Sequence, residues 1–383
     1  MKGNLRSVSI IGTGMIRFGK YPDKTVGQIA APAVLEALAE AGTSREEIEA
    51  IYCGSMISGT MTGQRVAREL GMTGKTIINC ENACSSSATA FREAWVNVAS
   101  GFYDRVLVIG AEQLTRLGGG TLPMEIEDIE AASGMVMPGL YAMRARRYMH
   151  EYGASKEDLA AVAVKARRHG ALNPLAQIQE EVSADQVLLS RTIADPLTLM
   201  QCCPMGDGAA ALVVCATEVA ARYCSKPVKV LASELTSGRY MPGFRDMTVP
   251  EVTVRGSKEA YEMAGLGPED IDVAETHDAF SIAELLYYEA LGFCGRGEAT
   301  KLLREGATSV GGRIPVNPSG GLLSKGHPVG ATGAAQIVEI VRQLQGRCGP
   351  RQVEGAKVGL AHVTGGGIYG FDHGACAIHV FAR

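Results

Sequence analysis

The feature that most constrains the fold of this chain is a sequence pattern that occurs once in each half. One segment, AGTSREEIEAIYCGSM, begins at Ala41, and the other, AGLGPEDIDVAETHDAF, begins at Ala264. Both contain a helix end, a turn with a capping residue, an acidic pair, an isoleucine and then a strand, so that Ile48 aligns with Ile271. Repetition of a supersecondary unit indicates a duplicated architecture. We therefore predict two copies of one α/β unit.

Strands and helices alternate within each half. The first half predicts strands over 7–11, 48–51, 76–80 and 106–109, and helices over 25–41 and 85–100. The second half predicts strands over 228–233, 271–274, 357–362 and 374–381, and helices over 256–264 and 331–345. Strands that are apolar on both faces are typical of parallel sheets covered by helices on both sides. The fold class is therefore α/β.

A segment between the halves does not follow this alternation. It contains a glycine triplet at 118–120, many Met, Arg and Tyr residues, and helix-like runs at 141–151 and 156–169. Such a segment is too long for a simple connection. We expect an inserted loop or lid domain that binds substrate. The predicted domain boundaries are 1–114 plus 191–225 for the first half, 115–190 for the loop domain, and 226–383 for the second half.

Composition excludes several classes of protein. The net charge is −4 and no basic block occurs, which argues against nucleic acid as a partner. No apolar run has the length of a membrane span, and the N-terminus has the pattern of a first strand, not of a signal peptide. The ten cysteines form no CxxC pair, so we expect no structural zinc and a reducing cytoplasm.

Cys84 is the candidate nucleophile. It lies in the segment NACSSS (82–87), directly before a predicted helix of small residues. A helix N-terminus lowers the pKa of a thiol and stabilises an oxyanion, and the thiolate is the reactive form. The other cysteines considered are interpreted as small buried apolar residues: Cys80, Cys202, Cys203, Cys215, Cys224 and Cys348.

Two histidines in the second half are candidates to activate this thiol. His327 lies in a loop rich in glycine and proline, GHPVGATG (326–333), which can hold an imidazole rigidly ahead of a helix. His277 follows a predicted strand, and strand ends in α/β folds carry functional sites. A cysteine with distant histidines, brought together by the fold, is typical of a covalent acyl-transfer site.

Other polar motifs have structural interpretations. Asp278 is expected to cap the helix that begins near residue 281. Asp372 and His373 fit a hairpin turn, and GDGAAA (206–211) fits a tight turn into a buried strand. The glycines that follow His362 can either converge their N–H groups on a substrate oxygen or form a plain hairpin.

At these motifs the chain resembles the thiolase superfamily over essentially its whole length. NACSSS resembles the nucleophile motif, GDGAAA the DGAAA turn, and GHPVGATG the GHPxGxTG motif. HDAF (277–280) resembles the HDxF signature of the sterol-carrier-protein-2-like branch, whose archaeal and bacterial members look most similar. The resemblance implies the thiolase fold: two duplicated halves with mixed five-stranded sheets, layered α-β-α-β-α, with an inserted loop domain, normally assembled as a homodimer.

The resemblance also implies residue roles. Cys84 would carry the acyl group, His327 would activate it, and His277 with His327 would stabilise the enolate oxygen of the second substrate. The N–H groups of Cys84 and Gly365 would form the oxyanion hole. No metal is expected in this chain. Coenzyme A would bind as a substrate at the loop domain, where the basic candidates are Arg144, Arg146, Arg147, Lys165, Arg167 and Arg168.

One position departs from the family pattern. Typical thiolases carry a second cysteine in a CxGGG motif, where it acts as acid and base at the substrate α-carbon, and the matching residue here is Val363. Some members of the branch carry a cysteine within HDCF instead, and that position here is Ala279. A histidine is the preferred substitute because its pKa lies near neutrality. The candidates are His277, His362, Tyr369 and Cys376.

The expected function is a thiolase that cleaves a 3-oxoacyl-CoA with CoA, or runs the reverse Claisen condensation, through an acyl-Cys84 intermediate. A role in fatty or aromatic acid degradation is favoured, with a branched or aromatic acyl group such as that of benzoylsuccinyl-CoA. Many chains of this type work with a small partner protein that has an OB-fold and often a zinc ribbon. The alternatives are a retro-aldolase acting on a β-hydroxyacyl-CoA, a non-catalytic acyl-CoA-binding subunit, and a ketosynthase.

Overall fold

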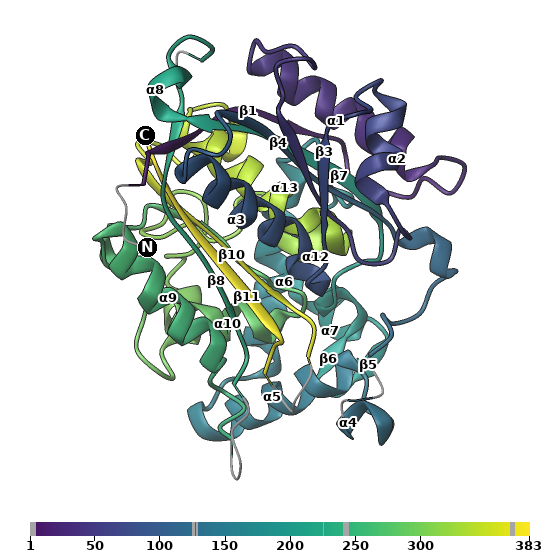
Figure 1. The fold of residues 1–383 in the computed structure, drawn as a ribbon. Helices are drawn as coiled ribbons and strands as arrows, with labels where there is room; N and C mark the ends of the chain where they lie inside the picture. Colours follow the sequence, from purple (N-terminus) through teal and green to yellow (C-terminus); the bar gives the residue numbers. More distant parts are fainter. Residues whose placement is uncertain (1–4, 125–126, 128, 225, 240–244, 368–371) are drawn as a thin grey trace.

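The computed structural model describes residues 5–124, 127, 129–224, 226–239, 245–367 and 372–383 (Figure 1). Nine strands form one mixed sheet in the order β3-β2-β4-β7-β1-β8-β11-β10-β9. Their bounds are β1 (Val8–Met15), β2 (Ala50–Gly54), β3 (Thr76–Cys80), β4 (Arg105–Gln113), β7 (Asp207–Ala216), β8 (Val228–Ser237), β9 (Val273–Glu275), β10 (Val358–Gly365) and β11 (Ala375–Ala382).

The expectation of two five-stranded sheets is corrected by this topology. β1 pairs antiparallel with β8, through residues 8–10 and 228–230, and this pairing joins both halves into one continuous sheet. Through this pairing, β1 and β8 satisfy backbone hydrogen-bonding groups that would be unpaired at a free sheet edge. The second half contributes four strands, and Val316 takes the place of a fifth through an isolated parallel bridge to Ala274.

Helices cover the outer face of each half of the sheet and also fill the space between the two halves, which gives the predicted five layers. α1 (Val26–Glu40) and α2 (Thr62–Glu69) cover the outer face of the first half, and α9 (Glu251–Ala264) and α10 (Ser281–Ala290) cover that of the second half (Figure 1). α3 (Ser86–Ala99) and α13 (Val329–Leu344) pack against each other between the halves. All sixteen residues of α13 are buried, as its mostly apolar sequence requires.

The predicted duplication is confirmed by the positions of its elements. β2 begins two residues after Ile48 and β9 begins two residues after Ile271. Both strands pair parallel with the strand that follows the central helix of their half, β4 and β10 respectively. α3 and α13 hold equivalent places, so the two halves deliver their helix N-termini to a common region.

The segment between the halves is largely helical. It contains α4 (Ile129–Ala132), α5 (Met137–Tyr152), α6 (Lys156–Ala171) and α7 (Ala184–Leu189), and the predicted runs at 141–151 and 156–169 correspond to α5 and α6. The hairpin of β5 (Thr192–Ala194) and β6 (Leu197–Thr198) contacts α5 and α7 and so packs with these helices. The remaining α-helices of the described residues are short: α8 (Thr217–Ala220), α11 (Ala299–Arg304) and α12 (Gly321–Ser324).

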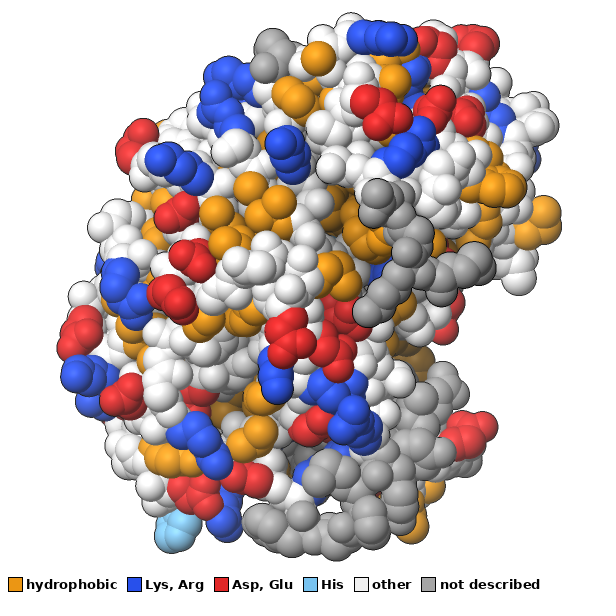
Figure 2. All heavy atoms as spheres, turned by 60° about the vertical axis from the view of Figure 1, so that its left-hand side comes forward, with side chains coloured by type: hydrophobic (Ala, Val, Ile, Leu, Met, Phe, Trp, Pro, Cys, Tyr) orange, Lys and Arg blue, Asp and Glu red, His pale blue; other side chains and the backbone are white. Residues whose placement is uncertain are grey.

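The surface has no dominant charge on the face seen in Figure 2. Basic and acidic side chains are interspersed there, in agreement with a net charge of −4. Within the described ranges, no helix combines the length and the apolarity needed to cross a bilayer.

Candidate active site

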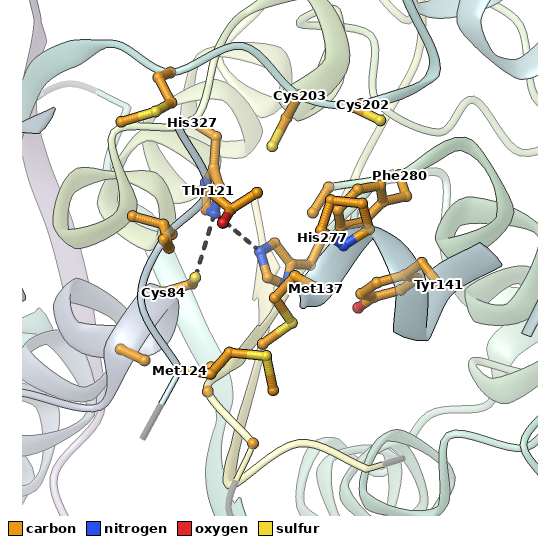
Figure 3. Close-up of a pocket in the computed structure, with 18 of the residues that line it drawn as sticks. Cys84, Thr121, Met124, Met137, Tyr141, Cys202, Cys203, His277, Phe280 and His327 are labelled. Atoms are coloured by element: carbon orange, nitrogen blue, oxygen red, sulfur yellow. Dashed lines mark hydrogen bonds between the residues drawn. The ribbon is translucent and has the colours of Figure 1, made fainter. Parts of the chain in front are cut away.

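The structure brings Cys84, His277 and His327 together in a cavity of about 620 Å³ (Figure 3). His327 Nε2 lies 3.3 Å from Cys84 Sγ and 3.4 Å from His277 Nε2. The sulfur comes from the first half and both imidazoles come from the second. The cavity therefore lies where the duplicated halves meet.

A strained turn presents Cys84 to this cavity. Ala83 has a positive φ of 50°, which is costly for a residue with a side chain. The turn is stabilised by Glu81, whose Oε1 accepts from Ala83 N–H at 2.6 Å, and by Ser86, whose hydroxyl donates to Ala83 O at 2.6 Å. Ser87 Oγ accepts from the backbone of α13 at 2.9 Å. The serine run thus shapes the turn and ties it to the second half.

His327 is oriented as a hydrogen-bond acceptor toward Cys84. The Thr332 hydroxyl donates to Pro328 O at 3.1 Å, so it accepts from His327 Nδ1 at 2.7 Å. A neutral imidazole with its proton on Nδ1 has a free lone pair on Nε2. That lone pair faces the Cys84 sulfur, which is the geometry of a general base with its nucleophile.

His277 is oriented as a hydrogen-bond donor. The Thr364 N–H donates to His277 Nδ1 at 3.3 Å, and Thr364 Oγ1 lies 2.6 Å from the same nitrogen. The Tyr287 hydroxyl lies 3.1 Å from Thr364 Oγ1. With Tyr287 as the donor in this contact, the threonine hydroxyl donates its own proton to His277 Nδ1. Because Nδ1 accepts, the ring proton is on Nε2. His277 therefore presents an N–H to the cavity, where a substrate oxygen can accept it.

The resting pair of Cys84 and His327 is neutral. Burial raises the pKa of the Cys84 thiol to about 12, and the Glu112 carboxylate adds to the rise, although N–H groups of Gly366 and Cys84 itself oppose it. Burial and the nearby Lys325 lower the pKa of His327 to about 3. The expectation that the helix terminus lowers the thiol pKa is wrong for this resting state, because lost hydration outweighs the N–H groups.

Glu112, which sequence reasoning missed, connects the two halves behind this pair. Its carboxylate accepts from the N–H groups of Met56 at 2.8 Å and Ile57 at 3.1 Å, in the loop after β2. It also accepts from Gly330 N–H at 3.1 Å, at the start of α13. A buried carboxylate with several N–H donors fixes both segments, so it positions the loop that carries His327.

The glycines after β10 lie directly against the nucleophile turn. A Cβ on Gly365 would lie 2.1 Å from Asn82 O, so only glycine fits there. The N–H groups that act to lower the pKa of the Cys84 thiol are those of Gly366 and of Cys84 itself. The oxyanion hole assigned from the sequence to Cys84 and Gly365 therefore stays a proposal, with Gly366 as a further donor at the same place.

The candidates for the α-carbon acid and base lie mostly outside the cavity. His362 is fully buried, and its Nε2 lies 3.0 Å from Thr253 Oγ1 in α9. The Cys376 sulfur faces the same threonine at 3.9 Å. Neither residue lines the cavity, and Tyr369 lies outside the described residues. Of the three candidates that lie within the described residues, the structure brings only His277 to the substrate space.

Two structural interpretations are corrected. Asp278 does not cap α10, whose N-cap is Phe280; its Oδ1 instead accepts from Leu322 N–H at 2.7 Å and so caps α12. His373 lines the cavity, with Nδ1 2.9 Å from Gly366 O and Nε2 2.9 Å from the Tyr141 hydroxyl. No local motif marks His373; only its place before β11, next to β10 in the sheet, could have indicated it.

The basic residues assigned to coenzyme A are not equivalent. Arg144 is only 1% exposed and does not line the cavity, which argues against its role as a contact for coenzyme A. Arg147 is exposed and pairs with Glu151, and Arg168 is exposed, but neither lines the cavity. The exposed arginine that does line it is Arg191, which sequence reasoning missed. Of the other candidates, Arg146 pairs with Asp195, Lys165 pairs with Glu284 in the interior, and Arg167 is half-buried.

The walls of the cavity are mainly apolar and aromatic. Tyr141 and Phe280 stack with ring centroids 4.5 Å apart and an interplanar angle of 25° (Figure 3). Methionine, leucine and proline side chains extend this surface: Met56, Leu114, Leu122, Pro123, Met124, Met137, Pro138, Leu199 and Met205. Such walls favour a large apolar acyl group over a small polar one.

The three central residues also have the spacing of metal ligands. Their sulfur and nitrogen atoms lie within 4.8 Å of one another, which suits a tetrahedral ion such as zinc. However, the contacts of Thr364 assign a proton to His277 Nε2, the atom that would bind the metal. The donor set therefore fits a hydrogen-bonded nucleophile better than a resident metal.

Comparison with known proteins identifies the family. The family model Thiolase, N-terminal domain, matches residues 8–218, and Thiolase C-terminal domain-like matches residues 233–372. The chain belongs to the thiolase family. This thiolase is similar to named acyltransferases along nearly its whole length, and it is an acyltransferase of that type.

Three relatives and one solved structure define the similarity. The benzoylsuccinyl-CoA thiolase subunit BbsB of Thauera aromatica is 45% identical, with 94% of this chain and 95% of the relative covered. Acetyl-CoA acetyltransferase of Methanothermobacter thermautotrophicus is 40% identical, with 99% and 100% covered. Sterol carrier protein 2 of Bos taurus is 38% identical, with 94% and 70% covered. An Ltp2-ChsH2(DUF35) aldolase structure has a TM-score of 0.84 at 29% identity, with 98% of each chain covered.

Proposed function

We propose that this thiolase cleaves a 3-oxoacyl-CoA with free CoA through an acyl-Cys84 intermediate, and that the acyl group is aromatic or branched. The observation that carries this proposal is the 3.3 Å contact between Cys84 Sγ and the lone pair of His327 Nε2. The same site can run the reverse Claisen condensation, since direction depends on the concentrations of the thioesters.

The residues divide the first half-reaction between them. His327 takes the Cys84 proton as the sulfur attacks the 3-oxo carbon, and the new oxyanion accepts from N–H groups of Cys84 and Gly365. The bond between C2 and C3 then breaks, and its electron pair becomes an enolate. His277 Nε2–H stabilises the enolate oxygen, because it is a donor that points into the cavity.

The cavity walls support an aromatic acyl group. The stacked pair of Tyr141 and Phe280 offers a flat surface in the cavity that holds the nucleophile, and the methionines adapt their shape to a bulky ligand. The relative with 45% identity is named for benzoylsuccinyl-CoA, an aromatic thioester. Degradation of aromatic or fatty acids in the cytoplasm is the matching physiological role.

Coenzyme A is proposed to enter along the inserted segment 115–190. Arg147 and Arg168 are exposed on its helices, and Arg191 stands at the cavity. A homodimer core and a small OB-fold partner with a zinc ribbon complete the proposal. One relative is named as a subunit, and the structural neighbour is a complex with a DUF35 protein, which supports such a partner.

Retro-aldol cleavage is the second candidate, because that structural neighbour is described as an aldolase. Aldol cleavage needs no thiol nucleophile and no CoA as acceptor. The intact contact between Cys84 and His327 favours thiolysis over this reaction and over a non-catalytic binding role.

The test is incubation of the chain with benzoyl-CoA or acetyl-CoA, followed by mass spectrometry of the peptide that contains Cys84. An acyl adduct on Cys84 is expected, and none is expected in the Cys84→Ala variant. Cleavage of a thioester substrate by Cys84→Ala without added CoA would instead support the aldolase.

A further inference from the structure

Cleavage between C2 and C3 leaves a carbanion at C2 that needs a proton, and no residue has yet been assigned to this step. The proton must come from a side chain that reaches the cavity. The titratable side chains that line it, among the residues that the structure describes, are Glu81, Cys84, Tyr141, Arg191, Cys202, Cys203, His277, His327 and His373.

Most of these groups are committed to other contacts. Glu81 accepts from the nucleophile turn, and Tyr141 donates to His373 Nε2, since His373 Nδ1 donates to Gly366 O. Cys202 Sγ lies 3.4 Å from Thr198 O and donates to it. His277 and His327 already serve the enolate oxygen and the nucleophile, and Arg191 is too weak an acid.

Cys203 remains, and within the described part of the chain its thiol makes no hydrogen bond to another residue. Figure 3 shows its sulfur pointing toward the space near His327 and Thr121, whereas the Cys202 sulfur points away. The Cys203 N–H donates to Ala279 O at 2.9 Å, and Cys202 forms a β-bridge with Phe280. The loop that carries Cys203 is therefore held against the HDAF segment, at the wall of the cavity that also holds Cys84 and His327.

We propose that the Cys203 thiol is the acid and base at the substrate α-carbon in this thiolase. This inference rests on the proposed thiolytic function. It places the missing second cysteine on a third segment of the chain, neither at Val363 nor at Ala279. Ala279 is small and lines the cavity beside Cys203, so it leaves room for that thiol to reach the substrate.

The proton balance closes over both half-reactions. Cys203 Sγ–H gives its proton to C2 as the enolate collapses, so a C–H bond forms and a thiolate remains. The incoming CoA thiol then passes its proton to that thiolate while its sulfur attacks the acyl carbonyl. The bond from the acyl carbon to Cys84 breaks, and His327 returns the first proton to Cys84.

The electrostatics agree with the first of these steps. Burial raises the pKa of the Cys203 thiol well above its usual value, and the neighbouring Cys202 and Cys84 thiols add to this. A thiol that stays protonated at neutral pH is ready to act as an acid. Its thiolate, once formed in the same environment, is a strong base toward the CoA thiol.

The experiment compares exchange at C2 with acylation of Cys84, using acetyl-CoA as the probe in D2O. Loss of a general acid and base costs about 10²- to 10⁴-fold. We therefore expect Cys203→Ala and Cys203→Ser to lose deuterium incorporation into the acetyl methyl group by about 100-fold or more. The acetyl-Cys84 adduct should still form, at a reduced rate, because CoA must then leave as a thiolate without the Cys203 proton. Cys224→Ala, which lies outside the cavity, is the matched control and should exchange like the parent.

Three results would overturn the inference. The first is exchange by Cys203→Ala within about threefold of the parent, in a protein that still forms the adduct. The second is loss of exchange in Cys202→Ala but not in Cys203→Ala, which would assign the role to the neighbouring thiol. The third is absence of any Cys84 adduct in the parent, which would refute the thiolytic function itself and the inference with it. Formation of the adduct also reports that each variant is folded.

Discussion

Replacement of Thr332 by valine tests the assignment of His327 as the base. The valine has nearly the same shape but leaves the buried Nδ1–H of His327 without its acceptor at 2.7 Å. An unsatisfied buried donor costs about 1–3 kcal/mol. The ring then loses its preference for the tautomer whose Nε2 accepts the Cys84 proton. We expect acylation of Cys84 to slow by about 5- to 150-fold, since 1.4 kcal/mol corresponds to a factor of about ten.

The assay is the single-turnover rate of Cys84 acylation by benzoyl-CoA, followed by rapid quench and mass spectrometry. Thr332→Ser keeps the hydroxyl and should acylate at nearly the parental rate. Thr253→Val is the matched control, because it removes a buried hydroxyl from His362, outside the cavity, at a similar distance of 3.0 Å. Equal acylation rates in Thr332→Val and the parent would refute the tautomer argument. Slow acylation in Thr253→Val would instead indicate that His362 takes part in the reaction.

Three further predictions follow from the site. Because the pKa of His327 is lowered to about 3 and that of Cys84 is raised to about 12, neither group titrates between pH 5 and 8. The rate of Cys84 acylation should therefore be nearly independent of pH across that range. A titration midpoint near 6.5 in the rate would contradict the argument from burial. In steady-state kinetics, Arg191→Ala should raise the KM for CoA several-fold with little change in kcat, and the increase should be larger than that caused by Arg168→Ala. An unchanged KM would show that Arg191 does not contact CoA. Phe280→Leu should slow acylation by benzoyl-CoA about 2- to 10-fold more than it slows acylation by acetyl-CoA, since aromatic pairs contribute about 0.5–1.5 kcal/mol. Equal effects on the two acylation rates would argue against an aromatic acyl pocket.

The elements of the fold were largely predictable because their signals are local. The repeated segment around Ile48 and Ile271 predicted two equivalent strands, and the apolar run at 331–345 predicted the buried helix α13. The joining of both halves into one sheet was not predictable. It depends on the pairing of β1 with β8, and the partner of a strand edge is not encoded in either strand alone.

The candidate site divides in the same way. Cys84, His277 and His327 stand out because short motifs with glycine, proline and small residues surround them, and such motifs constrain the local backbone. His373 and Cys203 carry no such motif. His373 reaches the cavity because the turn before β11 brings its ring within 6.3 Å of the His277 ring, and Cys203 reaches it because the loop before β7 packs against the HDAF segment. From the sequence alone, Cys203 is therefore indistinguishable from an ordinary buried thiol.

The sequence by itself determined the duplicated α/β plan, the nucleophile and its two histidines, because these depend on patterns within a few residues. Only the tertiary structure decided which ring nitrogen of His277 and of His327 holds the proton, and that Cys84 rests as a neutral thiol. It also decided that Arg144 is buried and that Arg191 reaches the cavity. Hydrogen-bond direction and hydration are properties of the surroundings of a group, and those surroundings come from segments that are far apart in the chain.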